Sequence, residues 1–230
     1  VMAAFGPISV SAAPSPSPAL GTLLAAPPAG YTQLAGATFH GQFSAGAYAA
    51  QYQSSSLEAG VALIQDGFVD GYGMTWIQRS TGRVLLEFVI AFVGGKGANS
   101  WLGYEEKSDK ISAGYAHPDT LAGIDPYYGV HLVLTSPRSY ADAFSFVKGN
   151  DMFGVGFVSA KDDVLKLATS QTKTQYGSAP IETIPKAKWP ENNKFSRGTV
   201  NILAVVIGGV IALVLIAGVA RLVVGRLRGT

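Results

Sequence analysis

The chain has 230 residues, of which 48% are hydrophobic and 14% are charged. Soluble domains carry about 25% charged residues, so this composition excludes a freely soluble chain, a disordered chain and a coiled coil. The net charge is only +2, and three of the 17 basic residues lie in the last ten positions, so the chain lacks the clustered basic face that nucleic-acid binding requires.

The first thirty residues contain two segments that we expect to lie outside the folded domain. Residues 1–12 are apolar, and Val10 and Ala12 occupy the −3 and −1 positions of a signal-peptidase site, which is typical of the remnant of a secretory signal peptide. A flexible apolar tail on a cytoplasmic protein is the alternative. Residues 13–30 contain five prolines among alanines and serines, and this density favours an extended spacer.

The central region, residues 31–176, is predicted to contain alternating helices and hairpins. Residues 84–92 place alternate apolar side chains on one face and Glu87 on the other, a period of two that indicates a strand. The same reasoning, with glycine-containing turns and polar helix starts as boundaries, predicts further elements. The expected helices cover residues 43–53, 57–65, 97–110 and 161–176, and the expected strands cover residues 72–79, 84–92, 128–134, 143–148 and 152–159.

Two segments of this region share one order of elements. Residues 76–98 and residues 144–163 both have the pattern of a strand, a three-residue turn, a second strand and the start of a helix. We therefore expect two hairpin-plus-helix units related by a weak internal repeat. The predicted fold class is α+β, with one antiparallel sheet of five or six strands and helices packed on it.

The C-terminal part is predicted to anchor the chain in a membrane. Residues 200–220 are 21 consecutive residues without a charge, and as a helix they span roughly 30 Å, the thickness of a hydrocarbon core. We expect a juxtamembrane linker over residues 177–198, a transmembrane helix over residues 199–221 and a short basic tail over residues 222–230. Together with the signal-peptide remnant, this predicts an ectodomain outside the cell and a C-terminus in the cytoplasm.

Residues around this helix are candidates for contacts with the bilayer and with a partner. Long cationic side chains at both ends can reach the headgroups, and small residues within the helix permit close packing against another helix. For the two aromatic residues that precede the helix, packing on the domain is the alternative to membrane contact. The expected membrane-flanking charges are Arg197, Arg221, Arg226 and Arg228, and the expected contact residues are Trp189, Phe195, Gly208, Gly209 and Gly218.

Residues suited to catalysis or metal binding are sparse. The chain has no cysteine and three histidines, and it contains none of the common nucleophile, zinc-protease or nucleotide-binding motifs. His117 and Asp119, with Asp125 nearby, could form a carboxylate-rich site for zinc or manganese. No second histidine lies at helical or strand spacing from His117, and this favours a solvated loop. We therefore expect no catalytic, cofactor or metal site.

Tyr127 and Tyr128 are the candidate docking residues of the ectodomain. They follow a loop at the start of a predicted strand, where one of two neighbouring side chains points outward. Exposed tyrosines are favoured in protein interfaces. The alternative is that both belong to the core.

Several segments together resemble the envelope ectodomains that are common in actinobacteria. These are GFVDGYGMTWIQ at residues 67–78, GAxxWLGYEE at 97–106, AGIDPYYGVHL at 122–132, and SFVKGNDMFGVGF at 145–157 with SAKDD after it. The resemblance implies a signal peptide, a small α+β domain of the Mog1/PsbP-like kind and a single C-terminal helix that ends in arginine. It implies no known reaction, because such proteins act as binding or assembly factors or as accessory subunits of respiratory supercomplexes.

The sequence therefore predicts a non-enzymatic accessory subunit or assembly factor in the cell membrane. Its ectodomain would dock on the outer face of a larger integral membrane complex, such as an actinobacterial respiratory supercomplex. The alternative is a cell-envelope binding module that holds a lipid, glycan or other small ligand in a pocket lined by aromatic residues. The predicted partners are the complex and the lipid bilayer, with no nucleic acid.

Overall fold

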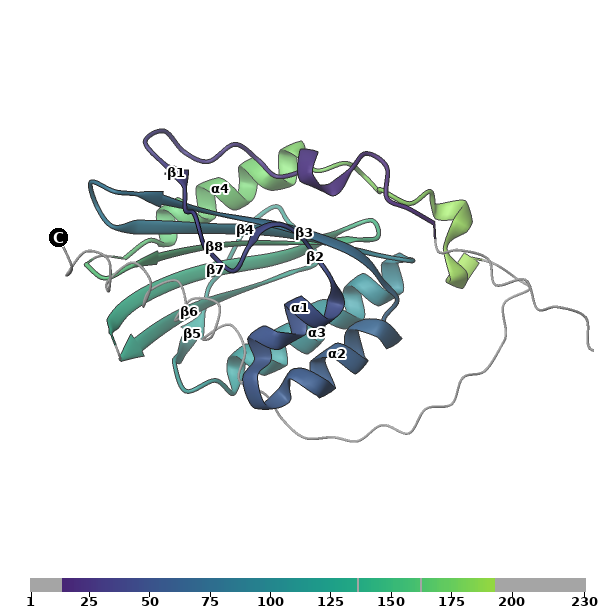
Figure 1. Cartoon of the computed structure of the whole chain (residues 1–230), viewed down its shortest axis with the longest axis horizontal. Coiled ribbons are helices and arrows are strands. Elements are labelled where there is room, and N and C mark those ends of the chain that lie inside the picture. The colour runs from purple at the N-terminus through teal and green to yellow at the C-terminus, as the bar shows by residue number, and fades with distance from the viewer. Residues whose placement is uncertain (1–13, 136, 162, 193–230) are drawn as a thin grey trace, which may run out of the picture.

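A computed structural model describes residues 14–135, 137–161 and 163–192 of the chain. They form an α+β domain in which one antiparallel sheet lies between two helical layers (Figure 1). The sheet order is β1-β3-β4-β8-β7-β6-β5, and β2 also pairs with β3. The strands are β1 (Thr32–Gln33), β2 (His40–Phe43), β3 (Phe68–Gln78), β4 (Arg83–Phe92), β5 (Tyr115–Pro118), β6 (Tyr127–Thr135), β7 (Arg138–Lys148) and β8 (Asp151–Ser159).

The helices divide between the two faces of this sheet. One face carries α1, the 3-10 helix η2, α2 and α3, and the other carries α4 together with the short N-terminal helix η1 (Figure 1). The bounds are η1 (Leu20–Thr22), α1 (Ala45–Ala49), η2 (Ala50–Ser55), α2 (Ser56–Gln65), α3 (Gly95–Lys110), α4 (Leu165–Ser178), η3 (Lys186–Lys188) and η4 (Pro190–Asn192).

Strand β4 shows why helices are needed on both faces. Its even-numbered residues, such as Phe88 and Ile90, pack in the core under α3, and odd-numbered residues such as Val89 pack in the core under α4. Glu87, expected on the face opposite the apolar residues, lies on the α4 face and is fully buried, and its Oε1 accepts a hydrogen bond from Gln171 Nε2 at 2.8 Å. The strand prediction is confirmed, and its polar face is buried as well.

The expected hairpin-plus-helix units correspond to β3–β4–α3 and β7–β8–α4. Their inner strands β4 and β8 pair antiparallel at the centre of the sheet, and α3 and α4 lie on opposite faces. The sheet has eight strands where five or six were expected. The additional strands are β1, β2 and β5, which have four residues or fewer and are too short to show a clear alternation.

The proline-rich segment before the sheet differs from the expected free spacer. Leu20 and Leu23 are buried in the core on the α4 side. Gln175 of α4 accepts a hydrogen bond from the Ala25 amide at 2.6 Å and donates one to the Leu23 carbonyl at 2.8 Å. The segment is packed on the domain because its apolar residues cover α4 and its backbone is paired by a glutamine.

The described part of the expected juxtamembrane linker also belongs to the domain. Thr183 is 1% exposed, and its backbone N–H and hydroxyl donate to Asn150 Oδ1 at 2.9 Å and to Asp151 Oδ1 at 2.6 Å. Trp189 is 8% exposed. The turn between β7 and β8 therefore holds this segment at Thr183, and Glu191 of η4 accepts a hydrogen bond from the Lys96 amide at the start of α3.

The other predicted segments are not described by the structure. No helix among the described residues is both long enough and apolar enough to cross a membrane. The predicted signal-peptide remnant, transmembrane helix and basic tail lie outside the described residues, and so do Phe195, Arg197, Gly208, Gly209, Gly218, Arg221, Arg226 and Arg228.

Candidate functional site

Three neighbouring strands place His117, His131 and Asp142 in one row across the sheet. His117 of β5 is paired with His131 of β6, and His131 is paired with Asp142 of β7. Residues directly opposite each other in antiparallel strands have their side chains on the same face. The second histidine that the spacing around His117 did not supply therefore comes from the neighbouring strand.

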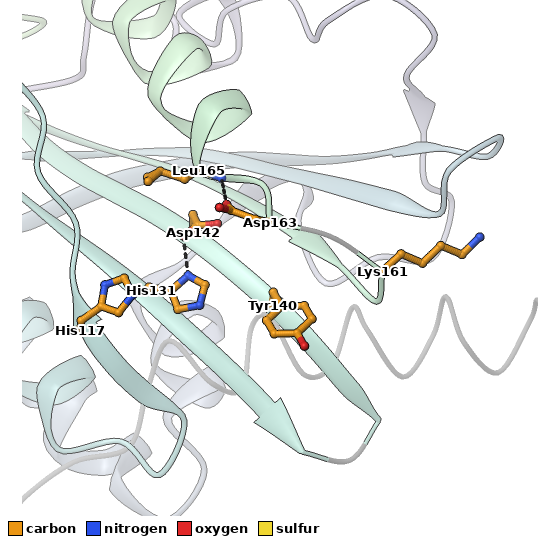
Figure 2. A pocket seen from close by; sticks show the side chains of 7 residues that line it. All are labelled: His117, His131, Tyr140, Asp142, Lys161, Asp163 and Leu165. Carbon is orange, nitrogen blue, oxygen red and sulfur yellow. Dashed lines mark hydrogen bonds and ion pairs between the residues drawn. The ribbon is translucent and has the colours of Figure 1, made fainter.

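These side chains contact one another at the edge of the α4 layer (Figure 2). His131 Nδ1 and Asp142 Oδ1 are 2.6 Å apart, and the two histidine rings stack with their centroids 4.6 Å apart. Asp142 Oδ2 accepts a hydrogen bond from the Val164 backbone amide, just before α4, at 3.2 Å. Asp142 is thereby fixed by the helix start, and it in turn fixes the orientation of the His131 ring.

Asp119 approaches the row from the end of β5. Its backbone amide donates to the Gly129 carbonyl of β6 at 3.0 Å. A Cβ atom at Gly129 would lie 2.6 Å from the Asp119 carbonyl oxygen and 2.5 Å from the Phe144 ring, so the glycine permits this close approach. The Asp119 side chain is 3% exposed, and its Oδ1 lies 3.5 Å from His117 Nδ1. Its Oδ2 is buried without a hydrogen-bond partner among the described residues.

The carboxylates of Asp119 and Asp142 therefore lie together in one largely buried site. Burial, reinforced by the Asp142 carboxylate beside it, raises the pKa of Asp119 to about 6, and the nearby His117 and His131 oppose this rise. Two carboxylates held this close in a largely buried site repel each other when both are ionised. A cation between them would remove this repulsion.

The cluster has the composition of a metal-binding site. Asp119, His131 and Asp142 each offer one ligand atom, and these three atoms lie within 4.8 Å of one another. Imidazole and carboxylate groups suit zinc and related divalent transition-metal ions, and three protein ligands leave a coordination position open. The site opens into a pocket of about 380 Å³ lined by His117, His131, Tyr140, Asp142, Lys161, Asp163 and Leu165 (Figure 2).

The carboxylate-rich site considered for His117, Asp119 and Asp125, against which a solvated loop was favoured, is present in part. His117 and Asp119 lie together as expected, but on a strand and its end instead of a solvated loop. Asp125 is exposed and is not a member of the cluster. His131 and Asp142 take its place, and sequence reasoning missed them in this role because the strand register brings them together.

The predicted docking residues of the ectodomain, Tyr127 and Tyr128, are both half-buried. The Tyr128 hydroxyl lies within hydrogen-bond distance of two acceptors, Asp109 Oδ2 at 2.9 Å and Glu105 Oε2 at 3.1 Å. The Tyr127 hydroxyl accepts a hydrogen bond from a backbone amide at 2.8 Å. Trp189 donates its indole N–H to the Ile184 carbonyl at 2.7 Å. All three polar groups are therefore used within the domain, and Trp189 packs on the domain, which was the alternative to membrane contact.

Comparison with known proteins found no matching family model and no matching curated protein. Among solved structures, the chain is similar to the crystal structure of the extracellular domain of PknH from Mycobacterium tuberculosis. The TM-score is 0.41 and the sequence identity is 12%, and the match covers 68% of this chain and 95% of that one.

Proposed function

We propose that this domain binds a divalent transition-metal cation between Asp119, His131 and Asp142. The observation that carries the proposal is the buried Asp119 Oδ2, which has no hydrogen-bond partner among the described residues and lies in the same cluster as a second carboxylate. Buried polar atoms are nearly always paired, because a buried atom without a partner keeps the full cost of its desolvation. A cation would pair this oxygen and neutralise the two carboxylates at once.

Each residue has a distinct part in this proposal. Asp119 supplies the oxygen that lacks a partner, His131 supplies an imidazole nitrogen, and Asp142 supplies an oxygen on a carboxylate that the Val164 amide already holds. His117 stacks on His131, and its side chain is 58% exposed at the mouth of the site. The open side of the cation would face the pocket, where water or a small ligand can complete its coordination.

This proposal develops the binding-module alternative from the sequence, with a metal ion as the ligand. In the cell envelope such a domain would capture or hold the ion outside the membrane. The accessory-subunit role stays a prediction, since it depends on a partner complex that the described residues do not identify.

Calorimetric titration of the full chain in mild detergent with Zn²⁺ tests the proposal. We expect one ion per chain in the wild type, and affinity reduced by about tenfold or more in Asp119→Asn, because loss of a ligand or its support typically costs that much. Asp125→Asn is the matched control, since it makes the same chemical change at an exposed aspartate outside the cluster. Absence of binding to the wild type, or equal affinities in the two variants, would contradict the proposal.

A further inference from the structure

Helix α2 carries apolar side chains on two opposite sides. Ala59 and Leu63 are fully buried in the core, whereas Leu57, Val61 and Ile64 are 79%, 44% and 69% exposed. Spacings of four and three residues place these three in one line along the helix, which we name the α2 stripe. A helix needs one apolar side to pack on its own domain, and a second one that is exposed is typical of an interaction site.

The C-terminal end of α2 lies where the described chain ends. The Asp66 carbonyl that follows α2 is so close to Gly97 that a Cβ there would lie 1.8 Å from its oxygen. In the same first turn of α3, the Lys96 amide donates to Glu191 Oε1 of η4 at 2.9 Å. Figure 1 shows the end of α2, η3 and η4 at the same end of the sheet. Both α2 and η4 therefore meet at the start of α3.

This end of the domain is close in sequence to the predicted transmembrane segment. Eight residue steps lead from Asn192 to Val200, where the 21-residue uncharged segment begins. A fully extended chain covers at most about 3.5 Å per residue, so this end of the domain lies within roughly 28 Å of that segment. We propose that the α2 stripe docks on the headgroup layer of the membrane in which residues 199–221 are predicted to lie.

Because the predicted transmembrane helix would anchor the domain to the bilayer, a small apolar surface is sufficient for docking. An anchored domain is held at a high effective concentration next to the bilayer, so a few apolar side chains that insert at the interface can hold it there. The same end carries Lys186 and Lys188 of η3, both exposed, and their charge suits anionic headgroups. A stable dimer, in contrast, buries about 800 Å² on each partner, which is more than three side chains on a ten-residue helix supply.

The absence of cysteine permits a direct test with single-cysteine labels. The full chain would be reconstituted in phosphatidylcholine vesicles with about 30% phosphatidylglycerol, which is enough anionic lipid for a negative surface potential. An environment-sensitive fluorophore would be attached at Leu57→Cys, Val61→Cys or Ile64→Cys. Lys173→Cys is the control, because Lys173 is exposed on α4 at the opposite face of the sheet. We expect the three stripe labels to shift to the blue and to be quenched by spin-labelled lipid, and the control label to do neither.

Three outcomes would overturn the proposal. The first is a set of stripe labels that remain as aqueous as the label at Lys173. The second is a blue shift that occurs in detergent and grows with protein concentration, which would identify a second copy as the occupant. The third is a shift that requires a co-reconstituted membrane protein in addition to lipid. The folding control is an unlabelled chain that carries Leu57→Ser, Val61→Ser and Ile64→Ser together. We expect it to keep the wild-type melting temperature, since these side chains contribute little to the core.

Discussion

The two faces of the β6–β7 pair hold two carboxylate clusters that differ in how they are satisfied. On the α3 face, buried Glu105 accepts hydrogen bonds from Tyr48, from Trp101 Nε1 at 3.0 Å and from Tyr128 at 3.1 Å. On the α4 face, Asp119 keeps an oxygen without a partner beside Asp142. The Tyr128 hydroxyl also lies 2.9 Å from Oδ2 of buried Asp109, so both faces hold two carboxylates, and among the described residues only those on the α3 face share a hydroxyl donor.

We infer from this difference that the α3-face cluster is structural and that the Asp119 cluster binds a ligand. Burial raises the pKa of Glu105, while the hydrogen bonds from Tyr48, Trp101 and Tyr128 lower it, so the carboxylate is supported by groups that the fold itself provides. For Asp119, both burial and the neighbouring Asp142 raise the pKa, and the nearby His117 and His131 offset this rise only in part. A cluster that its own fold leaves unsatisfied is suited to a ligand that completes it.

Removal of the Glu105 carboxylate, the acceptor of the α3-face cluster, should have the largest effect on the free energy of unfolding. Glu105→Ala leaves the Tyr48 hydroxyl and the Trp101 N–H buried without their acceptor, whereas Tyr128 keeps Asp109 Oδ2 at 2.9 Å. We expect the free energy of unfolding to fall by about 3–5 kcal/mol. Urea unfolding of the full chain in detergent, followed by tryptophan fluorescence, measures this loss. Glu105→Gln keeps an acceptor oxygen and should lose less than half as much. Equal losses in the two variants would show that side-chain volume matters and the acceptor does not.

Glu87 sharpens the comparison, because it is a buried carboxyl without a second carboxylate beside it. Burial raises its pKa from 4.5 to about 8, against a hydrogen bond from Gln171. The folded chain therefore keeps a proton that the unfolded chain releases, and this stabilisation is complete below pH 4.5 and is lost as the pH rises to about 8. Between these limits the free energy of unfolding should fall by an amount on the order of 4 kcal/mol.

Glu87→Gln should remove the part of the decline with pH that Glu87 contributes. A decline of comparable size should remain in the variant, because burial also raises the pKa of Asp151 from 3.8 to about 7. Urea unfolding of both chains at intervals from acid to mildly alkaline pH measures the two slopes. Identical slopes in the wild type and the variant would show that Glu87 does not carry this proton.

Gly129→Ala should damage the metal cluster through the backbone. The added Cβ meets the Asp119 carbonyl oxygen and the Phe144 ring, so we expect a loss of about 1–3 kcal/mol in stability together with weaker Zn²⁺ binding. Gly103→Ala in α3 is the control, because a Cβ there meets nothing within 4 Å and alanine favours the helix. Wild-type Zn²⁺ affinity in Gly129→Ala would show that the position of Asp119 is unimportant.

The smallest expected effect has the opposite sign. Without metal, Asp119→Asn removes a like charge from the pair and should raise the free energy of unfolding by about 1 kcal/mol. With saturating Zn²⁺ the wild type should become the more stable chain, since a ligand that binds the folded state stabilises it. Thermal unfolding of both chains, once with Zn²⁺ and once with a chelator, shows which chain is the more stable under each condition. If the wild type is the more stable chain under both conditions, Asp119 is a structural residue.

Sequence patterns predicted the long elements of the fold because each long element carries its own signal. The alternation in residues 84–92 and the repeated strand, turn and strand pattern correspond to β4 and to the two central hairpins. The short strands β1, β2 and β5 are fixed by pairing with longer neighbours, which no local pattern records. The packing of Leu20 on α4 depends likewise on a contact between distant parts of the chain.

The candidate site was predictable only in part, for the same reason. His117 and Asp119 are close in sequence and were recognised as possible ligands. His131 and Asp142 join them through the registers of β5 with β6 and of β6 with β7, and a shift of one residue in either register would move a side chain to the other face. One of Tyr127 and Tyr128 was expected to point outward, but both are half-buried, because β6 is covered on one side by α3 and on the other by the core under α4.

Anomalous diffraction at the zinc edge, from crystals of the full chain grown with Zn²⁺, tests the central claim most directly. The account predicts a peak about 2.0–2.2 Å from a carboxylate oxygen of Asp119 and from a ring nitrogen of His131, since these are the usual zinc–ligand distances. It also predicts that this peak disappears in Asp119→Asn and persists in Asp125→Asn. A peak elsewhere in the molecule, or none between these side chains at saturating Zn²⁺, would contradict it.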